Sequence, residues 1–289
     1  MSNIFQLLIS GVSMGFIYAL VAIEYTLIWN ATGLLNFSHD KFIMLSAYAF
    51  AGTYIAAIGL PPALAIVCTL ITMFLFGIVV ALIIFNPLSQ MGSNLYAIIG
   101  TVILGRIITE AVRLIWGPIP FTLDNFLKGA INFGDLVVSK PYFYIVVVCT
   151  LITFGLTLFL KKSKMGMAMR CVSNNKMAAG LMGINVPMNM AFTVGLSAAI
   201  CTTIGILIVP LFNVHPTMSS MIGLKGFCAG VVGGFGYLPG AILGGLLMGI
   251  VENFGSMVLP SIYKDCVSFG LLILFLLFRP SGILGHKKI

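Results

Sequence analysis

Two long apolar segments, residues 142–160 and 188–209, flank a loop that is basic and contains no acidic residue. A helix needs about 20 apolar residues to cross a membrane, and loops rich in Lys and Arg are retained on the cytoplasmic side. The arrangement therefore predicts two membrane-spanning helices joined by a cytoplasmic loop, 161–187. This loop holds five of the fifteen basic residues of the chain: Lys161, Lys162, Lys164, Arg170 and Lys176.

The composition extends this prediction to the whole chain. Of the 289 residues, 60% are hydrophobic and only 8% are charged, whereas soluble domains carry about 25% charged residues. We therefore expect an all-α membrane protein, a polytopic bundle of about eight or nine transmembrane segments with one of them short or broken. The bundle forms a single transmembrane domain over residues 1–289. The net charge of +8 is a topology signal, and we predict no nucleic-acid partner.

Nine segments are expected: 4–29, 42–58, 63–85, 95–116, 142–160, 188–209, 219–235, 240–259 and 261–278. Because Lys287 and Lys288 also belong inside, an even number of crossings must follow the basic loop. Counting back places the N-terminus outside and the C-terminus inside. The balanced charges of residues 117–141, namely Asp124, Lys128, Asp135 and Lys140, suit the non-cytoplasmic side. The first residues lack the basic start of a signal peptide, which predicts a retained first span.

Polar residues inside or beside the spans are candidates for a translocation pathway. Asn36, Ser38 and His39 interrupt two apolar segments, and Glu252 is the only acid between Asp135 and Asp265. A plain loop explains the first three equally well. We predict these four residues as pathway residues and leave the loop interpretation open.

Arg106, Glu110 and Arg113 share one face of the segment 95–116. Their spacing and alternating charge favour an ion-paired ladder that reaches the membrane interface. A contact with substrate is the less favoured alternative.

The last third of the chain is rich in glycine, which allows helices to approach closely. A break is expected over 236–240, where Pro239 stands. We predict that helix packing depends on Gly233, Gly234, Gly236, Gly240, Gly244 and Gly245.

The basic loop carries its own helical pattern. Met165, Ala168, Met169 and Val172 form an apolar stripe. Ser173 or Asn174 is expected to cap a second short helix that runs to Met182, with Gly183 as a left-handed stop. A basic, helical and partly apolar loop on the cytoplasmic face predicts a docking surface.

Motifs for catalysis and cofactor binding were not found. The sequence has no Walker A, H-E-x-x-H or G-x-S-x-G motif, and we predict no catalytic residues. His39, His215 and His286 show no ligand spacing, so no metal site is expected. The six cysteines show no C-x-x-C spacing and are interpreted as packing residues.

Four blocks of sequence nevertheless match a known pattern. The chain resembles the permease subunits of branched-chain amino acid type ABC importers, the shorter of that system's two permeases most closely. The blocks are Tyr18-Ala19-Leu20 with Asn36-Phe37-Ser38-His39, the loop Met165-Gly166 to Gly183-Ile184-Asn185, the stretch Gly233-Gly234-Phe235-Gly236-Tyr237-Leu238-Pro239-Gly240-Ala241, and Tyr263-Lys264-Asp265 to Gly285.

The resemblance implies a pore subunit without enzymatic activity. ATP would be used by two ATP-binding partner subunits, this chain would bind no cofactor, and an extracytoplasmic binding protein would deliver the solute. A second permease would complete a heterodimer, and membrane lipid would surround it in the bacterial-type inner membrane. The matched coupling residues are Arg170, Asn174, Lys176, Ala178, Gly183, Ile184 and Asn185. Met177, Leu181 and Met182 would form the buried contact.

The chain departs from the family pattern at Asp40, where glycine is usual, and at the charged ladder of 106–113. Branched-chain amino acids are the default solutes, while another amino acid, an amide or a urea-like solute remains open. Two alternatives stay open: a stand-alone secondary transporter or channel for a small polar solute, and an intramembrane enzyme.

Overall fold

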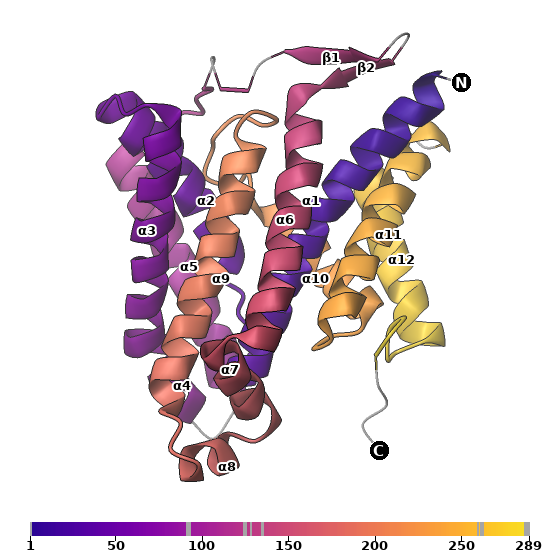
Figure 1. Ribbon diagram of the computed structural model, residues 1–289. Coiled ribbons are helices and arrows are strands. Elements are labelled where there is room, and N and C mark those ends of the chain that lie inside the picture. Colours follow the sequence, from indigo (N-terminus) through magenta and orange to yellow (C-terminus); the bar gives the residue numbers. More distant parts are fainter. Residues whose placement is uncertain are drawn as a thin grey trace. The chain divides into compact units, whose positions relative to one another are not determined.

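The computed structural model describes residues 2–90, 94–123, 126–127, 129–133, 136–258, 260 and 263–285, and most of these are helical (Figure 1). The elements are α1 (Ser2–Thr32), α2 (His39–Tyr48), the π-helical η1 (Ala49–Ala57), α3 (Pro62–Val80), the π-helical η2 (Ala81–Phe85), α4 (Asn86–Gln90), α5 (Asn94–Trp116), β1 (Ala130–Phe133), β2 (Leu136–Ser139), α6 (Lys140–Lys162), α7 (Lys164–Asn174), α8 (Lys176–Leu181), α9 (Val186–Ile208), α10 (Ser220–Gly233), α11 (Leu238–Val258) and α12 (Lys264–Phe278).

Six helical stretches among the described residues are long and apolar enough to cross a membrane. They confirm the predicted all-α, polytopic membrane fold. The stretches are Phe5–Thr32, Pro62–Ser89, Leu95–Trp116, Lys140–Lys162, Val186–Ile208 and Leu238–Met257.

The other three predicted segments correspond to shorter elements. The segment at 42–58 is divided between α2 and η1, while α10 has 14 residues and α12 has 15. At 1.5 Å per residue, a helix of 14 residues is about 21 Å long, less than the ~30 Å of a hydrocarbon core. The count of nine crossings therefore stays a prediction.

A short β-hairpin precedes α6 and was not predicted from the sequence. β1 pairs with β2 in antiparallel fashion, from Ala130 opposite Ser139 to Phe133 opposite Leu136. Three of the charges on which the topology of this region was based, Asp124, Lys128 and Asp135, lie outside the described residues. So do Lys287 and Lys288 in the tail.

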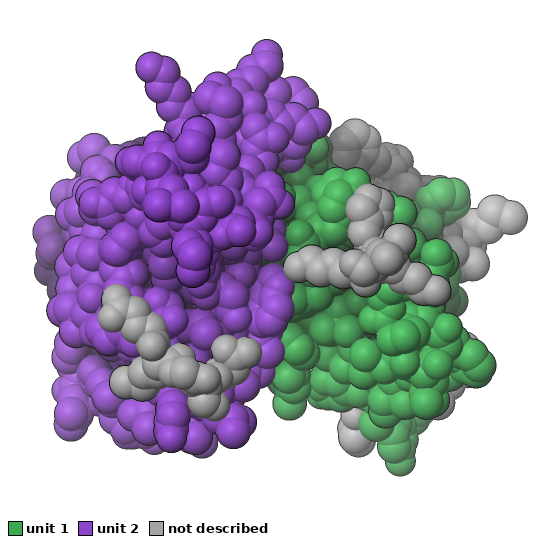
Figure 2. Space-filling model, turned by 90° about the horizontal axis from the view of Figure 1, so that it is seen from below, with its two compact units in different colours: residues 1–26, 124–153, 221–289 green, residues 27–123, 154–220 purple. Residues whose placement is uncertain are grey.

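The chain divides into two compact units, coloured separately in Figure 2. Unit 1 comprises residues 1–26, 124–153 and 221–289, and unit 2 comprises 27–123 and 154–220. Because one chain can form several compact units within one domain, the predicted single domain stays a prediction.

Unit 2 is organised around α9, most of whose residues are buried. Small residues bring its neighbours close: Gly195 faces the Phe74 carbonyl of α3, and Gly205 faces the Ile43 carbonyl of α2. A side chain at either position would collide with these neighbours. Glycine thus permits the close helix packing that membranes favour.

In unit 1, glycine likewise permits close packing of α1 against α11. Gly11 and Gly15 of α1 lie against the backbone of α11 near Gly249 and Leu246, and Gly245 lies against Ala19. These contacts place the glycine-rich third of the chain in a tightly packed helix pair.

The break between α10 and α11 is held by the C-terminal segment. Gly234 and Gly236 have φ values of +111° and +90°, which side chains disfavour. The amides of Ile283 and Leu284 donate to the carbonyls of Val232 and Gly233, at 2.9 and 3.1 Å. The end of α10 therefore has hydrogen-bond partners in place of the next helical turn. The helix resumes at Leu238, slightly earlier than the predicted 240.

Candidate functional site

The predicted docking loop is built from two short helices that follow α6 (Figure 1). The Ser163 hydroxyl accepts a hydrogen bond from the Gly166 amide at 2.8 Å and caps α7. Met169 and Val172 of the predicted apolar stripe are buried. The close approach of Gly166 to the Phe159 carbonyl further holds α7 against the end of α6. The first helix of the loop is thus fixed to its own span.

The second helix, α8, begins later than predicted. Its N-cap is Asn175, whose side chain accepts from the Ala178 amide at 3.0 Å. The predicted caps, Ser173 and Asn174, instead lie in the last turn of α7. The predicted start of α8 is therefore wrong by one or two residues. Ser173, Asn174 and Asn175 are all of cap-forming type, and α7 continues through the first two, so the third becomes the cap.

The end of α8 matches the predicted stop. Gly183 has a φ of +83°, and the Ile184 amide donates to the Ala179 carbonyl at 3.1 Å. Asn185 then caps α9 by accepting from the Met188 amide at 3.1 Å. Four of the predicted coupling residues, Ala178, Gly183, Ile184 and Asn185, therefore take part in the backbone geometry that defines α8.

The outer face of α8 is apolar and exposed. Met177, Leu181 and Met182 have exposed fractions of 80%, 86% and 84%. Large apolar side chains at this level of exposure contribute almost nothing to the packing of their own chain. Their grouping on one short helix makes a surface suited to contact with another protein.

The two predicted basic coupling residues differ in their surroundings. The Arg170 guanidinium is exposed and donates to the Lys161 carbonyl at a long distance of 3.4 Å. The Lys176 amine donates to the Thr32 carbonyl at the end of α1, and partial burial lowers the pKa of this amine. Arg170 is thus presented outward, whereas Lys176 ties α8 to the end of α1.

An irregular segment, residues 33–38, follows α1 and contains the predicted pathway residues Asn36 and Ser38, and a third, His39, begins α2. The Asn36 side-chain oxygen accepts from the Ser38 amide at 2.9 Å and from its hydroxyl at 2.6 Å. His39 Nδ1 lies 3.3 Å from the Asn36 carbonyl. All three side chains are buried. The structure brings them together as a compact turn at the start of α2.

This turn lies well inside the helix layer of unit 2. The Cys201 thiol donates to the His39 carbonyl at 3.8 Å, and Cys201 is closer to the end of α9 than to its beginning. Irregular backbone at membrane depth is tolerated where protein or water satisfies its polar groups.

Glu252, the fourth predicted pathway residue, belongs to unit 1 and lies at the buried end of an ion-pair network. Its carboxylate is 3.0 Å from the Lys225 amine and 3.4 Å from that of Lys264. Lys225 also pairs with Asp265 at 2.6 Å, and the Ser268 hydroxyl donates to Glu252 at 3.1 Å. The network joins α10, α11 and α12.

Lys225 is a site residue that was not predicted, although the sequence contains a signal for it. It is the only basic residue between Lys176 and Lys264, and it stands in a glycine-rich apolar helix. Its side chain is 7% exposed and that of Glu252 is 3% exposed. A buried lysine needs an acidic partner, and Glu252 is the acid on the next helix.

The charged ladder is only partly formed. Arg113 pairs with Glu110 at 3.0 Å, and both side chains are well exposed. Arg106 forms no ion pair within the part of the chain that the structure describes.

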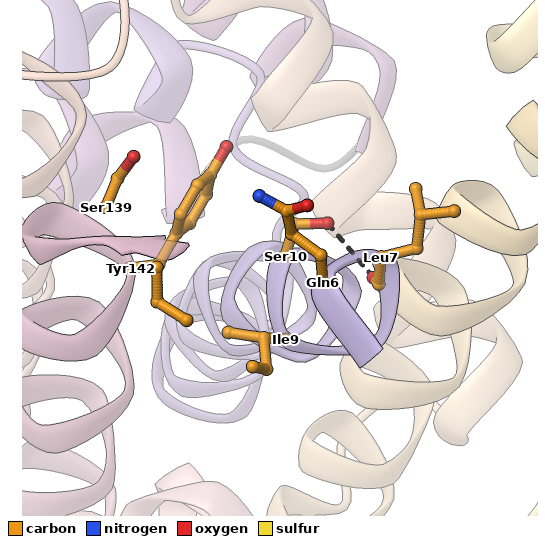
Figure 3. Close-up of a pocket in the computed structure, with 7 residues that line it drawn as sticks. Gln6, Leu7, Ile9, Ser10, Ser139 and Tyr142 are labelled. Carbon is orange, nitrogen blue, oxygen red and sulfur yellow. Dashed lines mark hydrogen bonds between the residues drawn. The ribbon is translucent and has the colours of Figure 1, made fainter. Parts of the chain in front are cut away.

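Unit 1 also holds a cavity of about 440 Å³ between the start of α1 and the start of α6. Figure 3 shows Gln6 and Ser10 on α1 and Ser139 and Tyr142 around the start of α6, with the Ser10 hydroxyl turned toward Leu7. The Ser10 hydroxyl donates to the Leu7 carbonyl at 3.0 Å. Amide and hydroxyl groups line this cavity, and no described lining residue is charged.

Comparison with known proteins covers nearly the whole chain. Residues 7–276 match the family described as branched-chain amino acid transport system / permease component. The chain is 37% identical to the high-affinity branched-chain amino acid transport system permease protein BraD of Pseudomonas aeruginosa, over 98% of this chain and 96% of that protein. It is 32% identical to LivH of Escherichia coli, a protein of the same description, with the same coverage. A probable LivH of Methanocaldococcus jannaschii is 28% identical, over 92% of this chain and 88% of the relative.

Proposed function

This chain belongs to the branched-chain amino acid transport system permease family, and we propose that it is the membrane-spanning subunit of an ATP-driven importer. Its solutes are branched-chain or related amino acids. ATP hydrolysis takes place on two separate subunits, and this chain contributes the path through the membrane. A second permease and an extracytoplasmic solute-binding protein complete the system. The N-terminus lies outside and the C-terminus inside.

The observation that carries this proposal is the exposed apolar face of α8. A permease has no energy source of its own, so ATP-driven movement must reach its helices through a rigid contact. α8 is capped at its start by Asn175 and stopped at Gly183. Its outward side chains, Met177, Leu181 and Met182, are free for burial against a partner.

The link from α8 to the spans is short. α7 packs on the end of α6, Asn185 starts α9, and Lys176 bonds the end of α1. A displacement of α8 by the ATPase subunits would therefore act on three helices of the chain at once. The surrounding basic residues suit acidic groups on the partner.

Co-purification tests the proposal. The tagged chain is isolated in mild detergent from its native membrane, and the ATPase activity of the preparation is measured. We expect two ATP-binding subunits and a second permease to accompany it, with activity that responds to the binding protein. Isolation of the chain alone under gentle conditions would contradict the proposal and favour a stand-alone transporter.

A charge reversal tests the coupling role. Arg170→Glu places a carboxylate where the exposed guanidinium stands, so we expect uptake to be lost while the protein is still produced and assembled. Arg279→Gln, which removes an exposed positive charge near the C-terminus, serves as the control. Normal uptake in the Arg170→Glu variant would remove this residue from the coupling surface.

A further inference from the structure

A second cavity, also of about 440 Å³, lies entirely within unit 2 and has charged walls. Three parts of the chain form it: the segment around the start of α2, the middle and end of α5, and the connection between α9 and α10. Its lining residues are Phe37, Asp40, Lys41, Val102, Gly105, Arg106, Thr109, Arg113, Pro216, Thr217 and Ser220.

Most of the charges in this cavity already have partners. The Lys41 amine lies 2.6 Å from the Asp40 carboxylate and donates to the Ser220 hydroxyl at 2.9 Å. Arg113 is paired with Glu110 at 3.0 Å. Arg106 is the lining cation for which no acidic partner is found among the described residues. Among the described residues, the cavity therefore carries one positive charge that no acidic side chain balances.

The position of Arg106 makes this imbalance significant. It lies near the middle of α5, one of the six stretches able to span a membrane. A guanidinium at the centre of a span costs about 2.5–3.5 kcal/mol on insertion scales and is normally turned toward water or protein. The adjacent Gly105 lies close to Ser38 and Lys41, which brings α5 against the polar start of α2. Arg106, whose side chain is exposed, thus lines the cavity from the middle of this helix.

We propose that this cavity is a solute site and that Arg106 binds the carboxylate of the transported amino acid. The inference rests on the proposed import function and adds a residue and a chemical group to it. A guanidinium can hold a carboxylate through two parallel hydrogen bonds. The hydroxyls of Thr217 and Ser220 line the same cavity, and Phe37, Val102 and Pro216 supply apolar wall for a side chain. The volume falls within the range of about 300–1,000 Å³ typical of small-molecule sites.

Ligand binding to the purified complex, without the solute-binding protein, tests the inference. The probes are leucine, isovalerate, which keeps the carboxylate and lacks the amine, and leucinamide, which lacks the carboxylate. We expect leucine and isovalerate to bind and leucinamide to bind at least about tenfold more weakly. Equal binding of leucine and leucinamide, or no binding of any probe, would overturn the inference.

Variants locate the contact. Arg106→Gln should weaken leucine binding by about 10–100-fold, since a hydrogen bond to a charged group is lost. Arg106→Lys should restore part of it, and Arg279→Gln should bind like the wild type. If Arg106→Gln does not assemble, the Arg106→Lys variant and the three probes on the wild type still show whether the carboxylate is bound. Wild-type leucine affinity in Arg106→Gln would refute the assignment.

ATP hydrolysis in the same preparations separates this inference from the proposed function. Activity that persists in Arg106→Gln while leucine binding and uptake fall supports both. Activity and uptake that are both unaffected by Arg106→Gln refute the solute site and leave the import function standing. A preparation without ATP-binding subunits refutes the import function and, with it, the inference that rests on it.

Discussion

Truncation of Leu181 to alanine tests the exposed face of α8 most sharply. The side chain is 86% exposed and lies on a helix that is capped independently by Asn175 and Gly183. Leu181→Ala should therefore leave the fold of the permease intact. If the ATP-binding subunit covers this face, the substitution removes apolar area only from the interface.

The magnitude follows from the area that is free for burial. Leucine has three more carbon atoms than alanine, and each buried CH₂ group is worth about 0.8 kcal/mol. With 86% of the side chain available, full burial corresponds to about 2 kcal/mol. Association with the ATP-binding subunit should weaken by about thirtyfold.

The assay is a titration of the ATP-binding subunit onto the permease in lipid nanodiscs. Leu277→Ala on α12 is the matched control, because that side chain is also well exposed, at 72%, and lies outside the docking loop. We expect a thirtyfold rise in Kd for Leu181→Ala and no change for Leu277→Ala. An unchanged Kd for Leu181→Ala would refute the assignment of α8 as the contact.

Two further predictions concern stability and are read from thermal unfolding in detergent. Glu252→Gln should destabilise the protein by about 1.5–3 kcal/mol, because Lys225 loses one of its two acidic partners and keeps Asp265. The double variant Lys225→Met/Glu252→Leu should lose less, and an equal loss in both would count against a paired role. Gly245→Val should prevent normal packing, because a side chain there collides with the backbone of Ala19. Gly270→Ala, where nothing lies within 4 Å, should be neutral or stabilising by up to about 1 kcal/mol; equal stability of the two glycine variants would refute the packing argument.

Apolar patterning was sufficient to predict the membrane class and the long helices. The segments 95–116 and 188–209 agree with α5 and α9 to within two residues at each end. This works because a span must satisfy its backbone hydrogen bonds within one continuous helix. The left-handed conformation of Gly183 could also be predicted, since it depends on local backbone geometry alone.

Features that depend on residues distant in sequence were harder to predict. Lys225 and Glu252 are separated by a helix break, so their pairing follows from the packing of α10 against α11 and α12. The start of α8 was ambiguous for another reason: Ser173, Asn174 and Asn175 are consecutive residues of cap-forming type. The position at which α7 ends, Asn174, determines that Asn175 is the cap.

The charged cavity of unit 2 could be predicted only in part. The sequence indicated that Arg106, Glu110 and Arg113 share a helix face, and the structure forms only the Glu110–Arg113 pair. Asp40 and Lys41 line the same cavity from the first turn of α2, and Ser220 lines it from the start of α10. No local pattern predicts that three distant segments enclose one space.

Uptake into proteoliposomes is the most direct test of the proposed import function. The complete complex is reconstituted with ATP enclosed in the vesicles, and radiolabelled leucine and the binding protein are added outside. We predict leucine accumulation that requires both ATP and the binding protein, and none with this chain alone. Accumulation by this chain alone, without ATP or partner subunits, would contradict the assignment as an importer subunit.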